Sequence, residues 1–189
     1  YTQEMAEFVK MFGEVAVPEG FNHTFFIDYG TLAVENTFKV AMDWKVSKLL
    51  AAGKITKGEA YNGKVGTKIM HFNEAFHGRS GYTLSVTNTN DPNKHQRFAK
   101  FNDWPRVVNP KVTFPLKDHL GEVEWLEALS LKQIKHAIAD DPNGIAAIII
   151  ETIQGEGGDN QFRTEFFQQL RQVCDESDIM LIFDEVQCG

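Results

Sequence analysis

Two continuous apolar runs near the carboxyl end, with an amphipathic stretch between them, constrain the fold more than any other feature. The runs are residues 145–150 (IAAIII) and 179–183 (IMLIF), and such runs are typical of parallel strands that are covered on both faces. Between them, residues 164–177 carry apolar side chains at the spacing of one helix face. The stretch therefore predicts a βαβ unit in an α/β protein, with a mostly parallel sheet and helices on both faces.

The rest of the chain reads as further helices and strands separated by polar loops. Glycine and proline mark most of the boundaries. The predicted elements are a helix over residues 4–15, a strand over 23–28, a helix from Gly30 that ends at Gly53, a loop over 54–66, a strand over 68–72, a long polar loop over 89–115 and a helix over 122–140. A loop as long as 89–115 in a compact domain is usually functional.

Composition excludes several classes of partner. The formal net charge is −7 and the lysines and arginines are scattered, which argues against nucleic acid or an anionic membrane surface. The longest apolar run, 145–150, is far shorter than the about 18 residues of a membrane span. Cys174 and Cys188 have neither CxxC nor metal-ligand spacing. We expect a cytoplasmic protein in a reducing compartment.

Both ends of the chain are unusual for a natural domain. The sequence begins at Tyr1 within an amphipathic helical pattern and stops at Gly189, directly after an apolar strand. A domain seldom ends on a core strand whose edge is open. We therefore expect these residues to be part of a longer protein.

Acidic and glycine-rich segments follow the two strands of the βαβ unit. Glu151 and the segment 154–159 (QGEGGD) follow the first strand, and Asp184 and Gln187 follow the second. Ligands of open α/β sheets bind beyond the carboxyl ends of the strands. An acid at such an edge alone often caps a helix or pairs with a neighbour. Two acidic clusters beside a glycine-rich turn favour a functional site.

Two further segments are candidate binding groups. Gly30 and Thr31 precede a helix, whose free N–H groups and dipole favour an anion; the alternative is an ordinary strand-to-helix turn. Phe76, His77 and Arg79 bring together a stacking ring, a titratable base and a cation that binds carboxylates through paired hydrogen bonds. The alternative is a core phenylalanine, a structural histidine and a surface ion pair, and the residues alone leave both alternatives open.

One rival interpretation is a P-loop ATPase. The segment 180–185 (MLIFDE) is similar to its Mg²⁺-binding strand, and Gly58, Gly63 and Lys64 have the spacing of its phosphate loop. However, Val65 stands where a hydroxyl must bind Mg²⁺. No apolar strand precedes the loop, and a strand rather than a helix follows it. These departures exclude the interpretation.

Four stretches, taken in order, resemble the class III (ω-amino) aminotransferases, which depend on pyridoxal 5′-phosphate (PLP). They are GTLAVENTFKVA, FNEAFHGRSGY, AAIIIETIQGEGG and LIFDEVQCG, and the match runs along essentially the whole chain. The resemblance implies PLP-dependent transferase fold type I. Residues 1–189 would form the central part of the large, PLP-binding domain, without the small domain and the remaining strands.

The same resemblance implies the roles of the cofactor-binding residues. The helix start would bind the phosphate, two side chains would enclose the pyridine ring, and polar groups would hold its heteroatoms. The residues are Gly30 and Thr31 at the phosphate, Phe76 and Val186 on the two ring faces, Asp184 at the protonated ring nitrogen, Gln187 at the ring hydroxyl oxygen, and Glu151 and His77 beside them. His77 is expected to be structural rather than a base.

Further segments (HGRSGYTLSVTNT, FNDWPR and GGDNQFR) resemble the branch of this class that moves the ε-amino group of L-lysine to 2-oxoglutarate, which gives 2-aminoadipate 6-semialdehyde and glutamate. Arg79 would clamp the α-carboxylate of lysine. Glu156 would mask a second arginine, outside this chain, when lysine binds and release it for glutamate or 2-oxoglutarate. Other members, acting on ornithine, acetylornithine or 4-aminobutyrate, and a non-catalytic binding remnant remain alternatives.

The resemblance also implies what this chain lacks. The lysine that bonds covalently to PLP lies beyond the FDEVQ strand in the family, and Lys45 and Lys68 do not match its motif. We therefore expect no turnover from this chain alone, and a homodimer for the whole protein. The strand at 23–28 would lack its neighbours in the sheet. Thr152 and Cys188 depart from the usual proline and threonine of the family.

Overall fold

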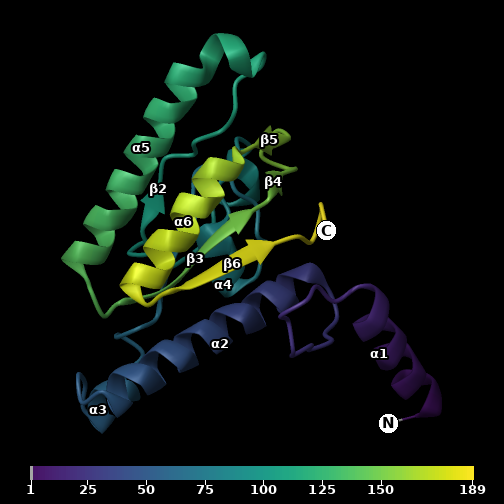
Figure 1. The fold of residues 1–189 in the computed structure, drawn as a ribbon. Helices are drawn as coiled ribbons and strands as arrows, with labels where there is room; N and C mark the ends of the chain where they lie inside the picture. The colour runs from purple at the N-terminus through teal and green to yellow at the C-terminus, as the bar shows by residue number, and fades with distance from the viewer. Residues whose placement is uncertain (1) are drawn as a thin grey trace.

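The computed structural model describes residues 2–189, which contain both helices and strands (Figure 1). In order they are α1 (Gln3–Val15), α2 (Gly30–Ala51), α3 (Lys57–Ala60), β1 (Lys68–Phe72), α4 (Gly81–Val86), the 3-10 helix η1 (Pro92–Lys94), β2 (Arg106–Val107), α5 (Leu116–Asp140), β3 (Ile145–Glu151), β4 (Ile153–Gln154), β5 (Asn160–Gln161), α6 (Thr164–Ser177) and β6 (Met180–Asp184).

The main sheet has the strand order β2-β1-β3-β6, and every neighbouring pair in it is parallel. β3 and β6 run in register from Ala147 opposite Met180 to Glu151 opposite Asp184. A separate antiparallel pair, β4-β5, lies just beyond β3. The predicted α/β class with a mostly parallel sheet is confirmed, and so is the βαβ unit of β3, α6 and β6.

Helices cover both faces of this sheet. α5 and α6 lie on one side and α2 on the other (Figure 1). From Ile148 to Ile150 the side chains of β3 alternate between the two cores, because Ile148 and Ile150 pack with the α5–α6 side and Ile149 with the α2 side. The whole of β3 is buried. Burial on both faces explains why this strand is an unbroken apolar run.

The predicted strand at residues 23–28 is wrong. Residues 21–27 form neither helix nor strand, and the Phe25 side chain is 75% exposed. The aromatic and β-branched residues favour a strand, but a strand forms only where a second backbone supplies hydrogen-bond partners. Within residues 2–189, the structure pairs no strand with this segment.

Other boundaries also differ from the sequence-based expectation. α5 begins at Leu116 rather than residue 122, and the long loop over 89–115 contains η1 and β2. α3 falls in the predicted loop over 54–66, where Thr56 and Glu59 form a reciprocal capping box. These short elements carry too few residues for a periodic pattern. The strand at 68–72 and the helix at 164–177 are confirmed at the predicted bounds.

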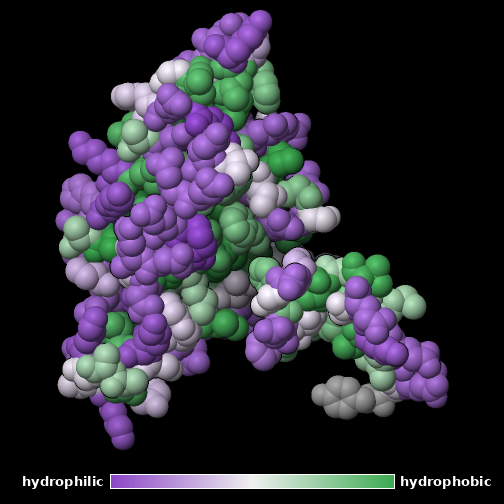
Figure 2. Space-filling model, viewed as in Figure 1, coloured by the Kyte–Doolittle hydropathy of each residue, from purple (hydrophilic) through white to green (hydrophobic). Residues whose placement is uncertain are grey.

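The amino-terminal arm, α1 with residues 16–29, projects away from the sheet (Figure 1). Phe26 anchors α1 through ring contacts of 5.4 Å with Phe8 and 5.3 Å with Phe12, measured between centroids. Figure 2 shows apolar side chains gathered along this arm, and Met5, Phe8 and Phe25 are among those exposed. Across residues 2–189, no helix combines the length and the hydropathy needed to cross a membrane.

Candidate functional site

The carboxyl ends of β3 and β6 place two carboxylates side by side. Glu151 and Asp184 end these strands and are register partners, and both side chains are buried. A parallel sheet brings the ends of its strands to one edge, so the sequence-based expectation of converging acids holds for this pair. Buried carboxylates need partners, and each of the two has a different one.

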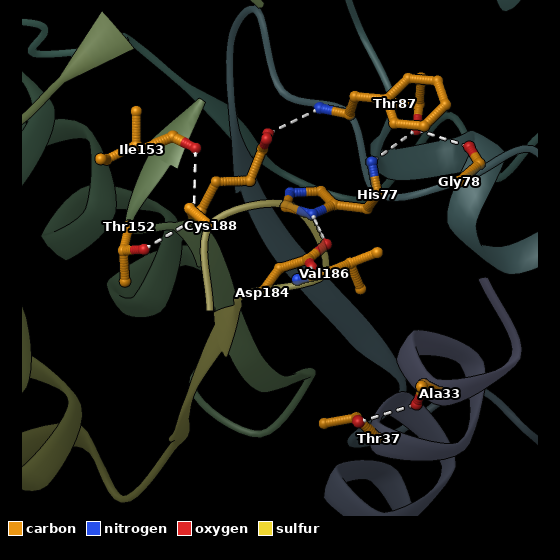
Figure 3. Close-up of polar contacts among 12 residues, drawn as sticks. Ala33, Thr37, His77, Gly78, Thr87, Thr152, Ile153, Asp184, Val186 and Cys188 are labelled. Carbon is orange, nitrogen blue, oxygen red and sulfur yellow. Dashed lines mark hydrogen bonds and ion pairs between the residues drawn. The ribbon is translucent and has the colours of Figure 1, made fainter. Parts of the chain in front are cut away.

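Asp184 is held by the His77 ring. His77 Nδ1 lies 2.7 Å from Asp184 Oδ2, and the His77 side chain is completely buried (Figure 3). The second carboxylate oxygen, Oδ1, accepts a hydrogen bond of 3.1 Å from the backbone N–H of Val186. Since a carboxylate only accepts, His77 Nδ1 carries the shared proton. Among the described residues His77 Nε2 has no hydrogen-bond partner. Asp184 is therefore an oriented anion beside a titratable ring.

Glu151 fixes the position of Phe76. Its Oε1 accepts a hydrogen bond of 2.8 Å from the backbone N–H of Phe76. Burial raises the pKa of Glu151, while the nearby His77 and the Phe76 hydrogen bond oppose this rise. Glu151 thus links the end of β3 to the segment that carries both Phe76 and His77.

Thr87 completes the support of this segment. Its buried hydroxyl accepts from the His77 backbone N–H at 3.0 Å and donates to the Gly78 carbonyl at 2.7 Å (Figure 3). His77 and Gly78 lie in the loop between β1 and α4, and Thr87 directly follows α4. Sequence reasoning missed Thr87, because a single threonine in a polar stretch carries no signal of this contact.

The start of α2 lies directly against these residues. A Cβ added to Gly30 would lie 2.5 Å from Val186 Cγ1, and one added to Gly78 would lie 2.4 Å from Thr31 Oγ1. No side chain caps the start of this 22-residue helix, and its first turn contains no acidic residue. Its first N–H groups therefore suit an anion, and two glycines allow the close approach of the neighbouring segments.

Gln187 and Cys188 pack the turn after β6 against the residues that follow β3 and β4. A Cβ on Gly155 would lie 2.4 Å from the Gln187 side chain, and Cys188 Sγ lies 2.9 Å from Thr152 Oγ1 (Figure 3). The two departures from the family pattern, Thr152 and Cys188, therefore contact each other. A hydroxyl–thiol contact replaces whatever a proline and a threonine provide at these positions.

Arg79 and Glu156 both contact Lys94, which lies in η1 after α4, away from the Asp184–His77 pair. Arg79 Nε donates to the Lys94 carbonyl at 3.3 Å, and its guanidinium lies 5.9 Å from the Phe98 ring centroid. Glu156 forms an ion pair with the Lys94 ammonium. Among residues 2–189, no hydrogen bond joins either residue to Asp184 or His77. Sequence reasoning missed Lys94, although it lies in the long polar loop that was expected to be functional.

Together these groups suit a flat, charged ligand. The start of α2 offers N–H donors for a phosphate, Asp184 offers a fixed negative charge for a cationic ring nitrogen, and Val186 packs against Gly30 between them. The geometry supports binding of such a ligand and the stabilisation of positive charge on it.

Replacing Glu151 with glutamine tests the cost of burying its charge. The raised pKa means that ionisation of Glu151 disfavours the folded state, so its contribution is most favourable below the unfolded pKa and is lost as pH rises through the folded value. In Glu151→Gln the amide oxygen still accepts from Phe76 N–H. We expect thermal unfolding at pH 7 to show equal or slightly higher stability, by at most about 1 kcal/mol, and no gain below pH 4.5. A clear loss at pH 7 would contradict this.

Comparisons of the sequence and of the structure with known proteins agree on one family. A family model described as "aminotransferase class-III" matches residues 1–189. The L-lysine-epsilon aminotransferase of Mycobacterium tuberculosis is 44% identical over 189 residues, which are 100% of this chain and 40% of that protein. That of Streptomyces clavuligerus is 41% identical, over 100% of this chain and 39% of that protein. A solved structure of lysine aminotransferase from M. tuberculosis matches with a TM-score of 0.90 at 46% identity and covers 100% of this chain and 41% of that one. The chain thus spans about two fifths of the length of these relatives.

Proposed function

Because the chain belongs to the class III aminotransferases, a PLP-dependent family, we propose that its protein transfers the terminal ε-amino group of L-lysine to 2-oxoglutarate. The products are 2-aminoadipate 6-semialdehyde and glutamate. The observation that carries the proposal is the buried Asp184–His77 pair at the end of β6, beside the uncapped start of α2. The whole-chain similarity to lysine aminotransferases supports the choice of substrate.

The residues of the site fit PLP. Gly30 and Thr31 hold the phosphate with the first N–H groups of α2, and Asp184 pairs with the protonated ring nitrogen. Phe76 and Val186 border the ring, and Gln187 lies next to them on the turn after β6. When bound, PLP supplies the electron sink for removal of a proton from the carbon that bears the amine. His77 keeps Asp184 oriented, and Glu151 keeps Phe76 in place.

Substrate choice rests on Arg79 and Glu156. Arg79 binds the α-carboxylate of lysine, so the distant ε-amine points toward Asp184 and the cofactor. Glu156 sets whether a second basic group, an arginine elsewhere in the protein, is masked for lysine or free for the second carboxylate of 2-oxoglutarate. Both residues contact Lys94, Arg79 through its carbonyl and Glu156 through its ammonium.

The lysine that bonds to PLP is proposed to lie outside these 189 residues. Lys45 donates to the Asp178 carbonyl, and Lys68 pairs with Asp103 and Asp141. Asp178 precedes β6 and Lys68 begins β1, so both lysines lie at the amino ends of the strands, opposite Asp184. This chain alone is therefore proposed to bind PLP at most reversibly and not to turn over.

We further propose a cytoplasmic homodimer. The apolar residues exposed along the amino-terminal arm (Figure 2) are the kind of surface that a second subunit covers. The resemblance to the family is the reason for choosing a second copy as the partner.

The test uses the complete protein that contains this chain. Purified protein is expected to show the absorbance of bound PLP and to form glutamate from 2-oxoglutarate only when lysine is added. Ornithine, acetylornithine and 4-aminobutyrate serve as competing donors, each expected to react at least about tenfold more slowly than lysine. If one of these donors reacts faster than lysine, that donor and not lysine is the substrate. If the protein shows neither bound PLP nor glutamate formation, the proposal is refuted.

A further inference from the structure

The turn between β4 and β5 carries Glu156, and the buried side-chain amide of Gln154 holds it in place. The side chain of Gln154 is completely buried, and its Oε1 accepts from Asn109 Nδ2 at 2.8 Å and from Asn160 Nδ2 at 2.9 Å. Its Nε2 donates to the Asn73 carbonyl at 3.0 Å. Buried and satisfied amides of this kind hold one backbone arrangement.

Glu74 also holds this turn in place. A Cβ on Gly157 would lie 2.2 Å from the Glu74 carbonyl oxygen, so the two backbones are in direct contact. The Glu74 carboxylate accepts from Lys111 Nζ at 2.6 Å and from Asn160 Nδ2 at 2.9 Å. The backbone on either side of Glu156 therefore has little freedom to move.

The side chain of Glu156 is held much less firmly. Its ion pair with Lys94 joins side chains that are 39% and 35% exposed. Exposed pairs of this kind contribute little, so another partner displaces them easily. A fixed backbone with an exchangeable side chain is what a two-position carboxylate requires.

Lys94 also contacts the other substrate-selecting residue. It ends η1, whose start is capped by Asp91 Oδ1 accepting from the Asn93 N–H at 3.0 Å. Its carbonyl accepts from Arg79 Nε, and its ammonium pairs with Glu156. One residue thus accepts a hydrogen bond from Arg79 and neutralises the charge of Glu156.

We propose that Lys94 is a specificity-determining residue, the resident counter-ion that holds Glu156 in the position which admits a second substrate carboxylate. The inference rests on the proposed function, because it concerns the dicarboxylate partner, 2-oxoglutarate. Without Lys94, the Glu156 carboxylate is unneutralised and repels a dianion that approaches it. Lysine has no second carboxylate, so its binding depends far less on Lys94.

The test measures binding of glutarate, a dicarboxylate with neither an amino nor an oxo group, to the complete PLP-loaded protein by calorimetry. Lys94→Met is expected to weaken glutarate binding about threefold to fivefold and to raise the KM for 2-oxoglutarate by a similar factor. The KM for lysine changes less than twofold. Lys94→Arg restores the affinity. In a Glu156→Gln background, Lys94→Met has almost no further effect, because the charge that it neutralises is gone.

Lys132→Met, which removes an exposed lysine from α5, is the matched control and is expected to change nothing. The inference is wrong if Lys94→Met leaves glutarate binding unchanged, or weakens it equally in the Glu156→Gln background. Lysine-dependent glutamate formation in the same preparation would then still support the proposed function. If the unaltered protein neither binds glutarate nor forms glutamate from lysine, both the inference and the proposed function are wrong.

Discussion

Replacing Asp184 with asparagine is expected to lower kcat/KM for lysine by about a hundredfold to a thousandfold. Asparagine has nearly the same shape: its side-chain oxygen can still accept from the Val186 N–H, and its NH2 group can donate to His77 Nδ1 once the ring carries its proton on Nε2. What disappears is a buried negative charge that stabilises a protonated ring nitrogen. The loss should appear in kcat and in PLP affinity, measured by dialysis and absorbance, because the cofactor loses its charged partner.

Glu185→Gln is the matched control for Asp184→Asn. Glu185 is the next residue along the chain, but it is exposed and lies outside the contacts of the site. It carries the same charge, so its removal changes the net charge of the protein equally. We expect less than a twofold change in kcat/KM. If Asp184→Asn retained more than a tenth of the activity while still folded, Asp184 would not be the partner of the ring nitrogen.

The parts of the fold that sequence predicts well are those in which burial determines the pattern. β3 packs against helices on both faces, so its residues 145–150 are all apolar, which is typical of a buried parallel strand. α6 has one buried face and a clear helical period. Residues 23–28 show the limit of this reasoning, because apolar side chains indicate that a segment favours burial but do not identify the segment that pairs with it.

The same distinction applies to the candidate site, where some contacts can be predicted from the sequence and others cannot. The neighbouring positions of Glu151 and Asp184 follow from the rule that parallel strands end at one edge, so the sequence places them together. The His77–Asp184 contact joins residues 107 positions apart in the chain. Nothing local to either residue specifies that distance. Thr87 and Lys94 were missed for the same reason, since tertiary packing alone gives a loop hydroxyl or ammonium its partner.

Replacing Gly78 with alanine is expected to cost about 2–4 kcal/mol of folding free energy and to weaken PLP binding. Two costs combine. Gly78 has a φ of 119°, a conformation that residues with a Cβ rarely adopt. The added Cβ would also lie 2.4 Å from Thr31 Oγ1 and 2.8 Å from Thr83 Oγ1. Because Thr31 lies at the start of α2, relief of this clash displaces the proposed phosphate site.

The control for Gly78→Ala lies three residues further on, where Gly81 begins α4 with nothing within 4 Å of an added Cβ. Gly81→Ala is expected to be neutral or to stabilise by up to about 1 kcal/mol, since alanine favours the helix. For both variants, chemical denaturation measures the change in folding free energy and PLP titration measures the change in cofactor affinity. A Gly78→Ala protein as stable as Gly81→Ala would mean that the segment relaxes without strain, and the tight packing of residues 76–78 on α2 would then not be required for the site.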